Sequence, residues 1–215
     1  DLRISAVQKH NEVDLVHCNF LIQIMKLLEH NDFLTSQSQK IREFYKYMAQ
    51  EYPYLSFTFK GRIKSLIRAE GKFNGYIVEY IYDYYEKNGS YPSVSEIKER
   101  LNCFRDLIAY RIVISMPRCH MKQKQDRKKE EIRYLYRIAN VLPQFLEERG
   151  FTAESTGGVK RSNSLLLDDA VRPYYRDYID GESTNSYRSL HITFFDNSAR
   201  CYMEMPVSYT HLRAH

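Results

Sequence analysis

The chain has 215 residues, a length that suits one α/β domain or two small ones. Hydrophobic residues make up 43% and charged residues 27%, as in an ordinary globular protein, and no apolar run is long enough to span a bilayer. The N-terminus lacks the apolar stretch of a signal peptide. The four scattered cysteines form no CxxC pair, which argues against a zinc site and against a disulfide framework. This cysteine usage indicates a protein of the reducing cytoplasm. The net charge of +5 favours anionic partners without choosing among them.

Two amphipathic helices are predicted at the start of the chain. Apolar residues recur at helical spacing over residues 11–29, and a second helix is expected to open at Ser36 or Ser38. We expect these helices to form an N-terminal segment over residues 1–52.

The period then changes from helical spacing to alternation. Apolar and polar residues alternate over residues 55–59, which predicts a strand. Arg62 and Lys64 follow at its end, two positions apart, so both can point to one side. Lys72 comes next, in what is expected to be a short connecting segment. Three cations after a strand could hold a polyphosphate, and the alternative is a solvated basic rim.

Two more helices are predicted before the next strand. Apolar and aromatic residues over 77–85 indicate a helix that ends at Asn88 and Gly89. Ser93 and Glu96 have the spacing of a capping box for a short helix over residues 94–101.

Residues 107–115 are rich in β-branched side chains and predict a buried strand. Asp106 directly precedes it, where a carboxylate could hold Mg²⁺ against phosphate oxygens or could simply be a loop aspartate. Arg111 lies inside the strand, where a charge is costly unless it is paired or functional.

The second half predicts a helix and a hairpin. The basic run over residues 118–129 is expected to be a solvated loop that enters a helix with its apolar face over 132–145, ended by Gly150. Residues 187–195 and 200–205 are expected to pair as a hairpin. Helices come first and strands mix with helices later, which predicts an α/β (α+β) domain with one mixed sheet flanked by helices.

The hairpin carries two further groups of interest. Tyr187, Ser189 and His191 share one strand face, where an aromatic ring and a histidine could bind a base and its sugar or phosphate. The alternative is a half-buried tyrosine and a core histidine. Glu204 lies between two methionines, so it points to the face opposite theirs, which more commonly means a solvated acid.

Taken together, these residues resemble the RelA/SpoT-type (p)ppGpp synthetases, and the resemblance covers roughly residues 55–205. The family has Arg-x-Lys with a second Lys ten residues after the Arg, an Asp-x-x-Ala/Gly-x-Arg strand, Asp-Tyr-Ile, Asn-Gly-Tyr-Gln/Arg-Ser-Leu-His and a strand with Glu-Ile-Gln. This chain has, in the same order, Arg62, Lys64 and Lys72; Asp106-Leu-Ile-Ala-Tyr-Arg111; Asp177-Tyr178-Ile179; Asn185-Ser186-Tyr187-Arg188-Ser189-Leu190-His191; and Glu204-Met205.

The resemblance implies a role for each residue that would bind ATP, the pyrophosphate donor, or the metal. Arg62 and Arg111 would sandwich the adenine of ATP, and Lys64 and Lys72 would hold its phosphates. Asp106 and Glu204 would be the catalytic carboxylates that share Mg²⁺. Glu204 would also take the proton of the attacking 3′-hydroxyl.

On the acceptor side, Tyr187 would stack on guanine, and Asn185, Arg176 and His191 would contact the acceptor nucleotide. The implied protein is a cytoplasmic, ATP- and GTP-binding transferase (a GTP diphosphokinase of the small alarmone synthetase kind) with a nucleotidyltransferase-like fold. It would make the stringent-response alarmone (p)ppGpp from ATP and GDP or GTP. The chain has no adjacent His-Asp pair of the type that marks the family's hydrolase domain, which implies synthesis without hydrolysis.

Two other functions stay open at this point. The same fold could pyrophosphorylate the 3′ end of tRNA, or the chain could be a non-catalytic nucleotide- or RNA-binding module with positive charge and abundant tyrosine. Keeping both Asp106 and Glu204 favours the enzymes, and a homo-oligomer is left open.

The chain departs from the family pattern in three places. Arg68 stands where the family usually has Ser, and Ser183 stands where it often has a phosphate-binding Lys. Pro206 replaces the Gln, and the ending from Val207 on resembles a translated sequencing adapter. We therefore expect a synthetase domain over 53–205 and a non-native tail over 206–215 that adds little to the core.

Overall fold

The computed structural model describes residues 8–29, 31–101, 104–121, 126–179, 188–198 and 201–209. The chain divides into two compact units. The helical unit combines Asp1–Thr35 with Ile63–Leu107, and the sheet unit combines Ser36–Arg62 with Ile108–His215. This grouping differs from the expected N-terminal segment 1–52, because that segment is shared between the two units.

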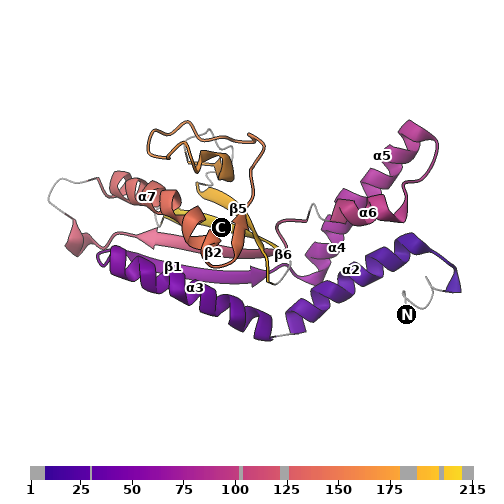
Figure 1. Ribbon diagram of the computed structural model, residues 1–215, viewed down its shortest axis with the longest axis horizontal. Coiled ribbons are helices and arrows are strands. Elements are labelled where there is room, and N and C mark those ends of the chain that lie inside the picture. Colours follow the sequence, from indigo (N-terminus) through magenta and orange to yellow (C-terminus); the bar gives the residue numbers. More distant parts are fainter. Residues whose placement is uncertain are drawn as a thin grey trace. The chain divides into compact units, whose positions relative to one another are not determined.

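The helical unit is built from helices joined by short turns (Figure 1). Its elements are α2 (Glu12–Glu29), α4 (Leu66–Phe73), the π-helical turn η1 (Asn74–Val78), α5 (Glu79–Asn88) and α6 (Val94–Leu101). Phe20, Phe73 and Phe104 meet at its centre, with ring centroids 5.6 Å apart for Phe20 and Phe73 and 4.9 Å apart for Phe20 and Phe104. These aromatic side chains bury enough apolar surface to hold α2 against α4.

Two expectations for the helical unit are confirmed and one is wrong. The capping box forms as predicted: the Ser93 amide donates to Glu96 Oε2 at 2.7 Å, and the Glu96 amide donates to Ser93 Oγ at 3.3 Å. Helix α5 ends at Asn88, and Gly89 follows with φ of 66°, a left-handed conformation that glycine adopts without strain. Lys72, however, lies in helix α4 and not in a connecting segment.

The reason for helix α4 is the spacing of its apolar residues. Ala69 and Phe73 are four positions apart and both are fully buried, while Leu66 packs against the same core. A stripe of only three residues gives a weak signal in the sequence, yet it is enough once α2 covers it.

The sheet unit contains one mixed sheet flanked by helices, which confirms the predicted fold class. Its elements are α3 (Asn31–Glu51), β1 (Ser56–Ile63), β2 (Ile108–Ser115), the short η2 (Arg118–His120), α7 (Arg127–Glu147), β3 (Phe151–Ala153), η3 (Arg172–Tyr174), β4 (Tyr175–Asp177), β5 (Leu190–Asp196) and β6 (Cys201–Tyr209). The strand order is β1-β2-β6-β5-β3, with β4 also paired to β5. Strands β2 and β6 are parallel, and β5 and β6 form the predicted antiparallel hairpin. Helix α3 begins at Asn31, earlier than the two serines suggested.

The two faces of the sheet differ in polarity. Paired residues share a face, and successive residues of a strand alternate between faces. One face, here called the apolar face, carries buried side chains from three neighbouring strands: Ile108, Tyr110, Ile112 and Ile114 of β2, Met203, Met205, Val207 and Tyr209 of β6, and Leu190, Ile192 and Phe194 of β5. We call the opposite side the polar face.

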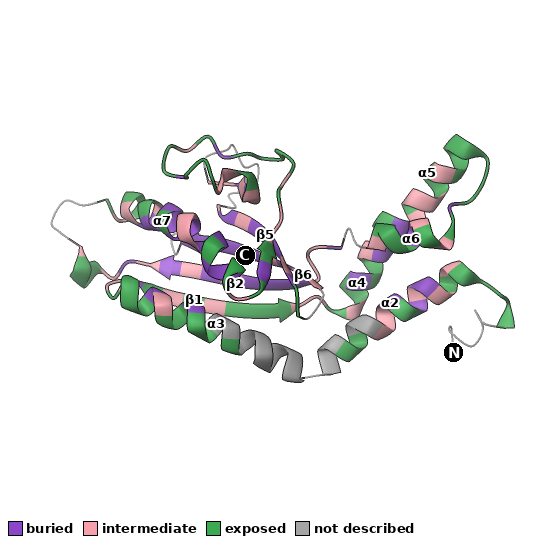
Figure 2. Ribbon diagram, viewed as in Figure 1, coloured by how far each residue is buried: buried purple, intermediate pink, exposed green. Residues whose placement is uncertain are grey.

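Helix α7 covers the apolar face. It lies against β2, β3 and β6 (Figure 1), and its Ala139 carbonyl accepts a hydrogen bond of 2.8 Å from Tyr175 Oη of β4. Figure 2 shows the consequence, because β2 is buried along most of its length whereas β1 at the sheet edge is largely exposed. Each fully buried Leu, Ile or Met of this face contributes roughly 1.5–3 kcal/mol.

The expectation that the residues from Pro206 on add little to the core is wrong as far as Tyr209. Strand β6 continues through Pro206 to Tyr209 between β2 and β5, and Val207 is 0% exposed. The pairing of β2 with β6 is interrupted between the pair Ala109↔Glu204 and the pair Ile112↔Val207. This break falls beside Pro206, which has no N–H to donate. Residues 210–215 lie outside the described part of the chain.

In the described residues, every helix is too short or too polar to cross a membrane.

Gly61 provides a test of this packing. A Cβ built on Gly61 would lie 2.8 Å from Cε1 of Tyr110, whose ring is buried on the apolar face. We expect Gly61→Ala to lower the free energy of unfolding by about 1–3 kcal/mol, because strand and ring must move apart. Gly71→Ala is the matched control: no atom lies within 4 Å of its added Cβ, so it should stabilise helix α4 by up to ~1 kcal/mol. Urea unfolding followed by circular dichroism measures both, and equal effects of the two changes would contradict the close approach at Gly61.

Candidate functional site

Two lysines and an aspartate meet in the helical unit. Asp106 Oδ2 accepts a hydrogen bond from Lys64 Nζ at 2.8 Å and lies 3.3 Å from Lys72 Nζ. Lys64 is positioned by its backbone, because its amide donates to the Leu107 carbonyl at 2.7 Å. Lys72 comes from the last turn of α4. We call these three residues the lysine–aspartate cluster, and it joins segments that are far apart in the sequence.

The charges of this cluster stabilise one another. Burial raises the pKa of Asp106, but the hydrogen bond and charge of Lys64, followed by Lys72, outweigh it and bring that pKa below its usual range. Burial lowers the pKa of Lys72, and the charge of Asp106 with the hydroxyl of Tyr76 raises it to a net value above the usual one. Asp106 and Lys72 are therefore both charged near pH 7. The Lys72 and Asp106 side chains remain about one-third exposed, at 33% and 34%.

Tyr76 belongs to the same surroundings and was missed by the sequence analysis. Lys72 Nζ lies 3.4 Å from Tyr76 Oη and 4.9 Å from the centroid of its ring. Tyr76 itself is exposed and rests edge-on against Phe104, 5.6 Å between ring centroids. An ammonium beside an accessible aromatic ring is suited to a ligand that combines phosphate with a flat base. The only sequence signal was the four-residue helical spacing from Lys72 to Tyr76.

The polar face of the sheet carries a second set of candidate residues. Glu204 of β6 pairs with Ala109 of β2 and with Thr193 of β5, so it lies on this face. Arg111 is two positions beyond Ala109, and His191 is two positions before Thr193, so both share the face.

Two more cations follow from the same alternation. Arg176 of β4 pairs with His191, which places it on the polar face. Gly61 faces Tyr110 on the apolar side, so its neighbour Arg62 points to the polar side. Five residues that the motifs singled out therefore lie on one face, contributed by five different strands: Arg62, Arg111, Arg176, His191 and Glu204.

Arg111 has an unusual environment on this face. Its Nε is buried and has no hydrogen-bond partner among the described residues. Buried donors are nearly always satisfied, and an unsatisfied charged group costs more than a neutral one. The pairing break beside Pro206 falls at Arg111. Structural pairing, the alternative considered from the sequence, does not account for this nitrogen in the described part of the chain.

His191 and Glu204 are in direct contact. His191 Nδ1 lies 2.8 Å from Glu204 Oε1, and His191 Nε2 lies 2.8 Å from Ser189 Oγ. The His191 and Glu204 side chains are mostly buried, at 13% and 18% exposure. This contact holds the Glu204 carboxylate against the His191 ring on the polar face.

Asp177, from the Asp-Tyr-Ile motif, has a structural role on the apolar side. Its Oδ2 accepts hydrogen bonds from Tyr136 Oη of α7, at 2.6 Å, and from Ser162 Oγ, and its Oδ1 accepts from the Ile179 amide at 2.7 Å. Asp177 is 5% exposed, so these partners satisfy a carboxylate that would otherwise be costly to bury. They anchor β4, and with it Arg176, to helix α7.

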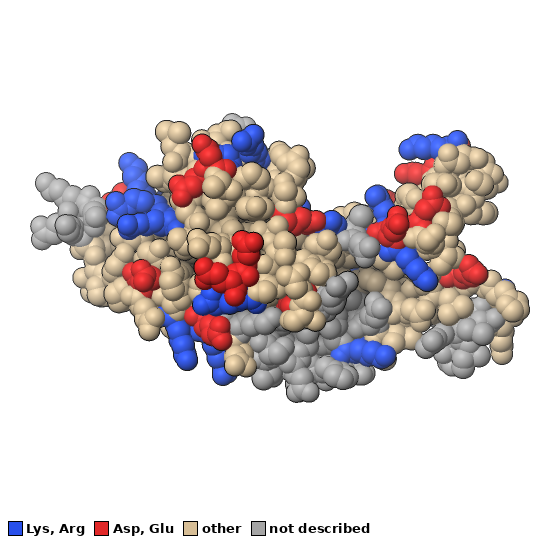
Figure 3. Space-filling model, in the orientation of Figure 1, with Lys and Arg blue, Asp and Glu red and all other residues tan. Residues whose placement is uncertain are grey.

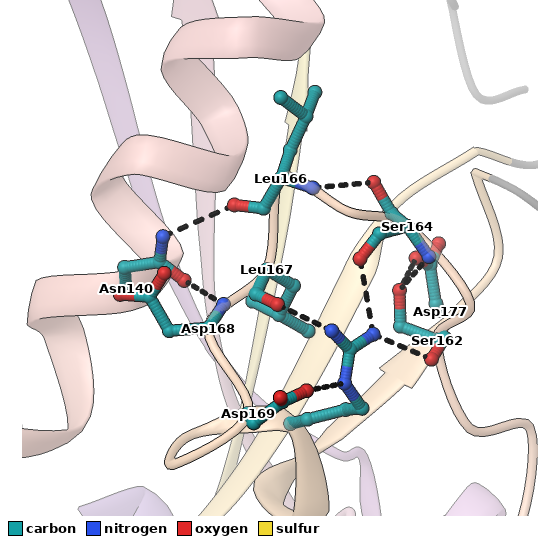
Figure 4. A network of polar contacts seen from close by, with 9 residues as sticks. Asn140, Ser162, Ser164, Leu166, Leu167, Asp168, Asp169 and Asp177 are labelled. Carbon is teal, nitrogen blue, oxygen red and sulfur yellow. Dashed lines mark hydrogen bonds and ion pairs between the residues drawn. The ribbon is translucent and has the colours of Figure 1, made fainter.

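Arg172 holds the loop that leads into β4 (Figure 4). Its guanidinium donates to the carbonyls of Ser162, Ser164 and Leu167 at 2.8, 3.0 and 2.6 Å and pairs with Asp169 at 2.9 Å. Figure 4 also shows Asn140 of α7 bonded to this loop. These contacts could not be predicted from local patterns, because they join residues of a segment without periodicity.

The candidate residues thus fall into two groups. Lys64, Lys72 and Asp106 belong to the helical unit, and the five polar-face residues belong to the sheet unit. Tyr187 and Asn185, the predicted acceptor-binding residues, lie outside the described part of the chain.

On the face shown in Figure 3, basic and acidic side chains are interspersed and form no single-signed field. The described residues contain no cluster of three or more His, Cys, Asp or Glu side chains that could hold a metal by themselves. Mg²⁺ commonly takes one or two carboxylates together with substrate phosphates, and the Asp106 carboxylate remains about one-third exposed.

Neither a scan against protein-family models nor a search of curated proteins gives a match for this chain.

The lysine–aspartate cluster predicts a pH-dependent stability. Because the folded-state pKa of Asp106 is lowered, its contribution is present above the unfolded value of about 3.9 and is lost as pH falls through the folded value. Asp106→Asn should therefore destabilise the protein at pH 7 by about 1–2 kcal/mol after solvent screening. The difference from the unaltered chain should shrink as pH falls below about 4. Thermal unfolding at several pH values measures it, with exposed Asp83→Asn in α5 as the control. A difference that stays constant down to pH 2 would show that the charge of Asp106 does not stabilise the fold.

Proposed function

We propose that this chain is an ATP:GTP/GDP 3′-pyrophosphotransferase of the alarmone-synthetase kind. The observation that carries the proposal is the polar face, where alternation in five strands collects Arg62, Arg111, Arg176, His191 and Glu204. These residues are dispersed in the sequence and were singled out by strand position and by the family resemblance. A purely structural sheet would have little reason to set three arginines around one glutamate on the face opposite its core.

The arginines suit the donor nucleotide. Guanidinium planes stack on aromatic rings, and the proposal assigns the adenine of ATP to Arg62 and Arg111. The buried Nε of Arg111, which has no hydrogen-bond partner among the described residues, supports this role, since a bound ligand could supply an acceptor. Lys64 and Lys72 are assigned to the phosphates, for which two charged ammonium groups beside one carboxylate are appropriate.

The proposed reaction transfers the β- and γ-phosphoryl groups of ATP together. The acceptor 3′-oxygen forms a bond to the β-phosphorus, the bond between that phosphorus and the α,β-bridging oxygen breaks, and AMP leaves. Glu204 takes the proton of the 3′-hydroxyl. Catalysis then depends mainly on positioning the two nucleotides and on neutralising charge, as in other transfers to phosphorus.

Asp106 and Glu204 are the residues that would hold Mg²⁺, by the oxygen chemistry of their side chains. When bound, the metal supplies charge neutralisation at the phosphates. The acceptor is assigned to Arg176 together with Tyr187 and Asn185. The proposal also places the protein in the cytoplasm, where ATP and guanine nucleotides are available.

Glu204→Gln separates chemistry from donor binding. We expect transfer to fall by ~10²–10⁴-fold, because the amide cannot accept the proton of the 3′-hydroxyl. The affinity for ATP should stay within about twofold, because Arg62, Arg111, Lys64 and Lys72 are untouched. Transfer of label from ATP to GDP gives the rate, and calorimetry gives ATP affinity, with Glu130→Gln on helix α7 as the control. Near-normal turnover of Glu204→Gln would refute the assigned general base.

Tyr187→Ala tests the acceptor side. One base stack is worth about 1–3 kcal/mol, so the KM for GDP should rise roughly 5- to 150-fold while ATP affinity is retained. Tyr187→Phe keeps the ring and should keep the KM. Initial rates against GDP concentration measure both variants. Equal KM values for the alanine and phenylalanine variants would remove Tyr187 from the acceptor site.

A further inference from the structure

Both ring nitrogens of His191 are already engaged within the protein. Nδ1 lies 2.8 Å from Glu204 Oε1, and Nε2 lies 2.8 Å from Ser189 Oγ. The ring also lies against Tyr178, with 4.9 Å between centroids, and the Lys160 ammonium lies 4.5 Å from the Tyr178 ring centroid. A histidine held on both nitrogens and on one ring face has its orientation determined by its neighbours.

Ser189 is placed to act on this ring and on nothing outside the protein. Its side chain and backbone are 0% exposed, so it does not reach a substrate. Its carbonyl accepts a hydrogen bond of 3.0 Å from the Tyr178 amide, which fixes the backbone next to the ring that it contacts. Any influence of Ser189 on the chemistry must therefore pass through His191.

With Glu204 as the proposed general base, and therefore ionised, the directions of the hydrogen bonds follow. An ionised carboxylate only accepts, so the contact with Glu204 requires a proton on His191 Nδ1. In the neutral imidazole, Nε2 is then the acceptor, and the Ser189 hydroxyl donates to it. The order Ser189, His191, Glu204 thus forms a chain of donors that ends on the carboxylate, and we call it the Ser–His–Glu relay.

The carboxylate of Glu204 needs such support. Glutamate has three rotatable side-chain bonds, and on a strand its head group is not fixed by the backbone. His191 is a diagonal neighbour on the adjacent antiparallel strand, since Thr193 pairs with Glu204 and His191 pairs with Pro206. A displacement of about 1 Å in a reacting group costs on the order of 10²-fold in rate.

We propose that Ser189 and His191 are positioning residues, which hold the Glu204 carboxylate in the orientation needed to take the acceptor proton. This inference rests on the proposed function and changes one part of it, because His191 then acts through Glu204 and does not bind the acceptor phosphates or ribose. Loss of the relay should lower kcat and leave the KM of the acceptor unchanged.

Ser189→Ala is the most direct test. Removing the hydroxyl frees one side of the His191 ring, and kcat should fall about 10- to 100-fold, as for other partners that orient a functional side chain. The KM for GDP and the melting temperature should stay close to those of the unaltered chain. Ser208→Ala is the matched control, a serine equally buried on the polar face whose Oγ lies 3.5 Å from the Ile112 carbonyl. It should keep the original kcat.

Two substitutions of His191 separate positioning from acceptor binding. Asparagine places an amide near the position of Nδ1 and can still donate to Glu204, whereas glutamine places it near Nε2. We expect His191→Asn to retain at least tenfold more kcat than His191→Gln. A raised KM for GDP in both variants, with kcat unchanged, would overturn the relay and assign His191 to the acceptor.

A measurement that does not depend on activity distinguishes the positioning role of Ser189 and His191 from the proposed enzyme function. Imidazole ¹⁵N resonances at one neutral pH should show the proton on His191 Nδ1, and they should shift in Ser189→Ala and Glu204→Gln but not in Ser208→Ala. A ring with averaged tautomers and no response to these changes would overturn the relay, whatever the activity. If the relay signals are present and the unaltered chain transfers no pyrophosphate, the enzyme assignment fails and the role in catalysis falls with it.

Discussion

Strand β6 sets the constraint on which the rest of the sheet unit depends. It lies between β2 and β5, and its odd-numbered residues from Met203 to Tyr209 are buried under helix α7. Because side chains alternate, Glu204 has to project from the other face. A shift of one residue in register would turn that glutamate toward the core under α7 and the neighbouring methionines toward the polar face, so the same packing that stabilises the core also specifies where the carboxylate lies.

The polar face shows how function and stability compete. Three arginines, a histidine and a glutamate occupy a face that could have been covered by apolar side chains, and the buried Nε of Arg111 lacks a hydrogen bond in the described structure. Other parts of the sheet unit offset the cost of these polar residues. The side chains of the apolar face are buried, and the hydrogen bonds of Asp177 join β4 to α7 with both carboxylate oxygens paired. The lysine–aspartate cluster follows a different rule, since its charges neutralise one another before any ligand binds.

Features with a periodic or capping signal could be predicted from the sequence, and features made by long-range contacts could not. The hairpin of β5 and β6, the capping box at Ser93 and the buried strand β2 were predicted, because each has a local pattern. Helix α4 was missed, since its apolar stripe is too short, and so were β3 and β4, which have three residues each. Alternation also indicated the side of Glu204, but the contact of His191 with it requires knowledge of which strands are neighbours. The burial of Val207 follows from partners on both sides of β6, which composition does not reveal.

The most direct test of the account is the fate of the terminal phosphates of ATP. The chain is incubated with Mg²⁺, γ-labelled ATP and one acceptor at a time: GDP, GTP, AMP or tRNA. The account predicts that label appears on the ribose 3′-position of the guanine nucleotide, with AMP released in equal amount. Label on tRNA alone would contradict the assigned acceptor, and release of free phosphate or no reaction with any acceptor would contradict the assignment of the polar face to pyrophosphate transfer.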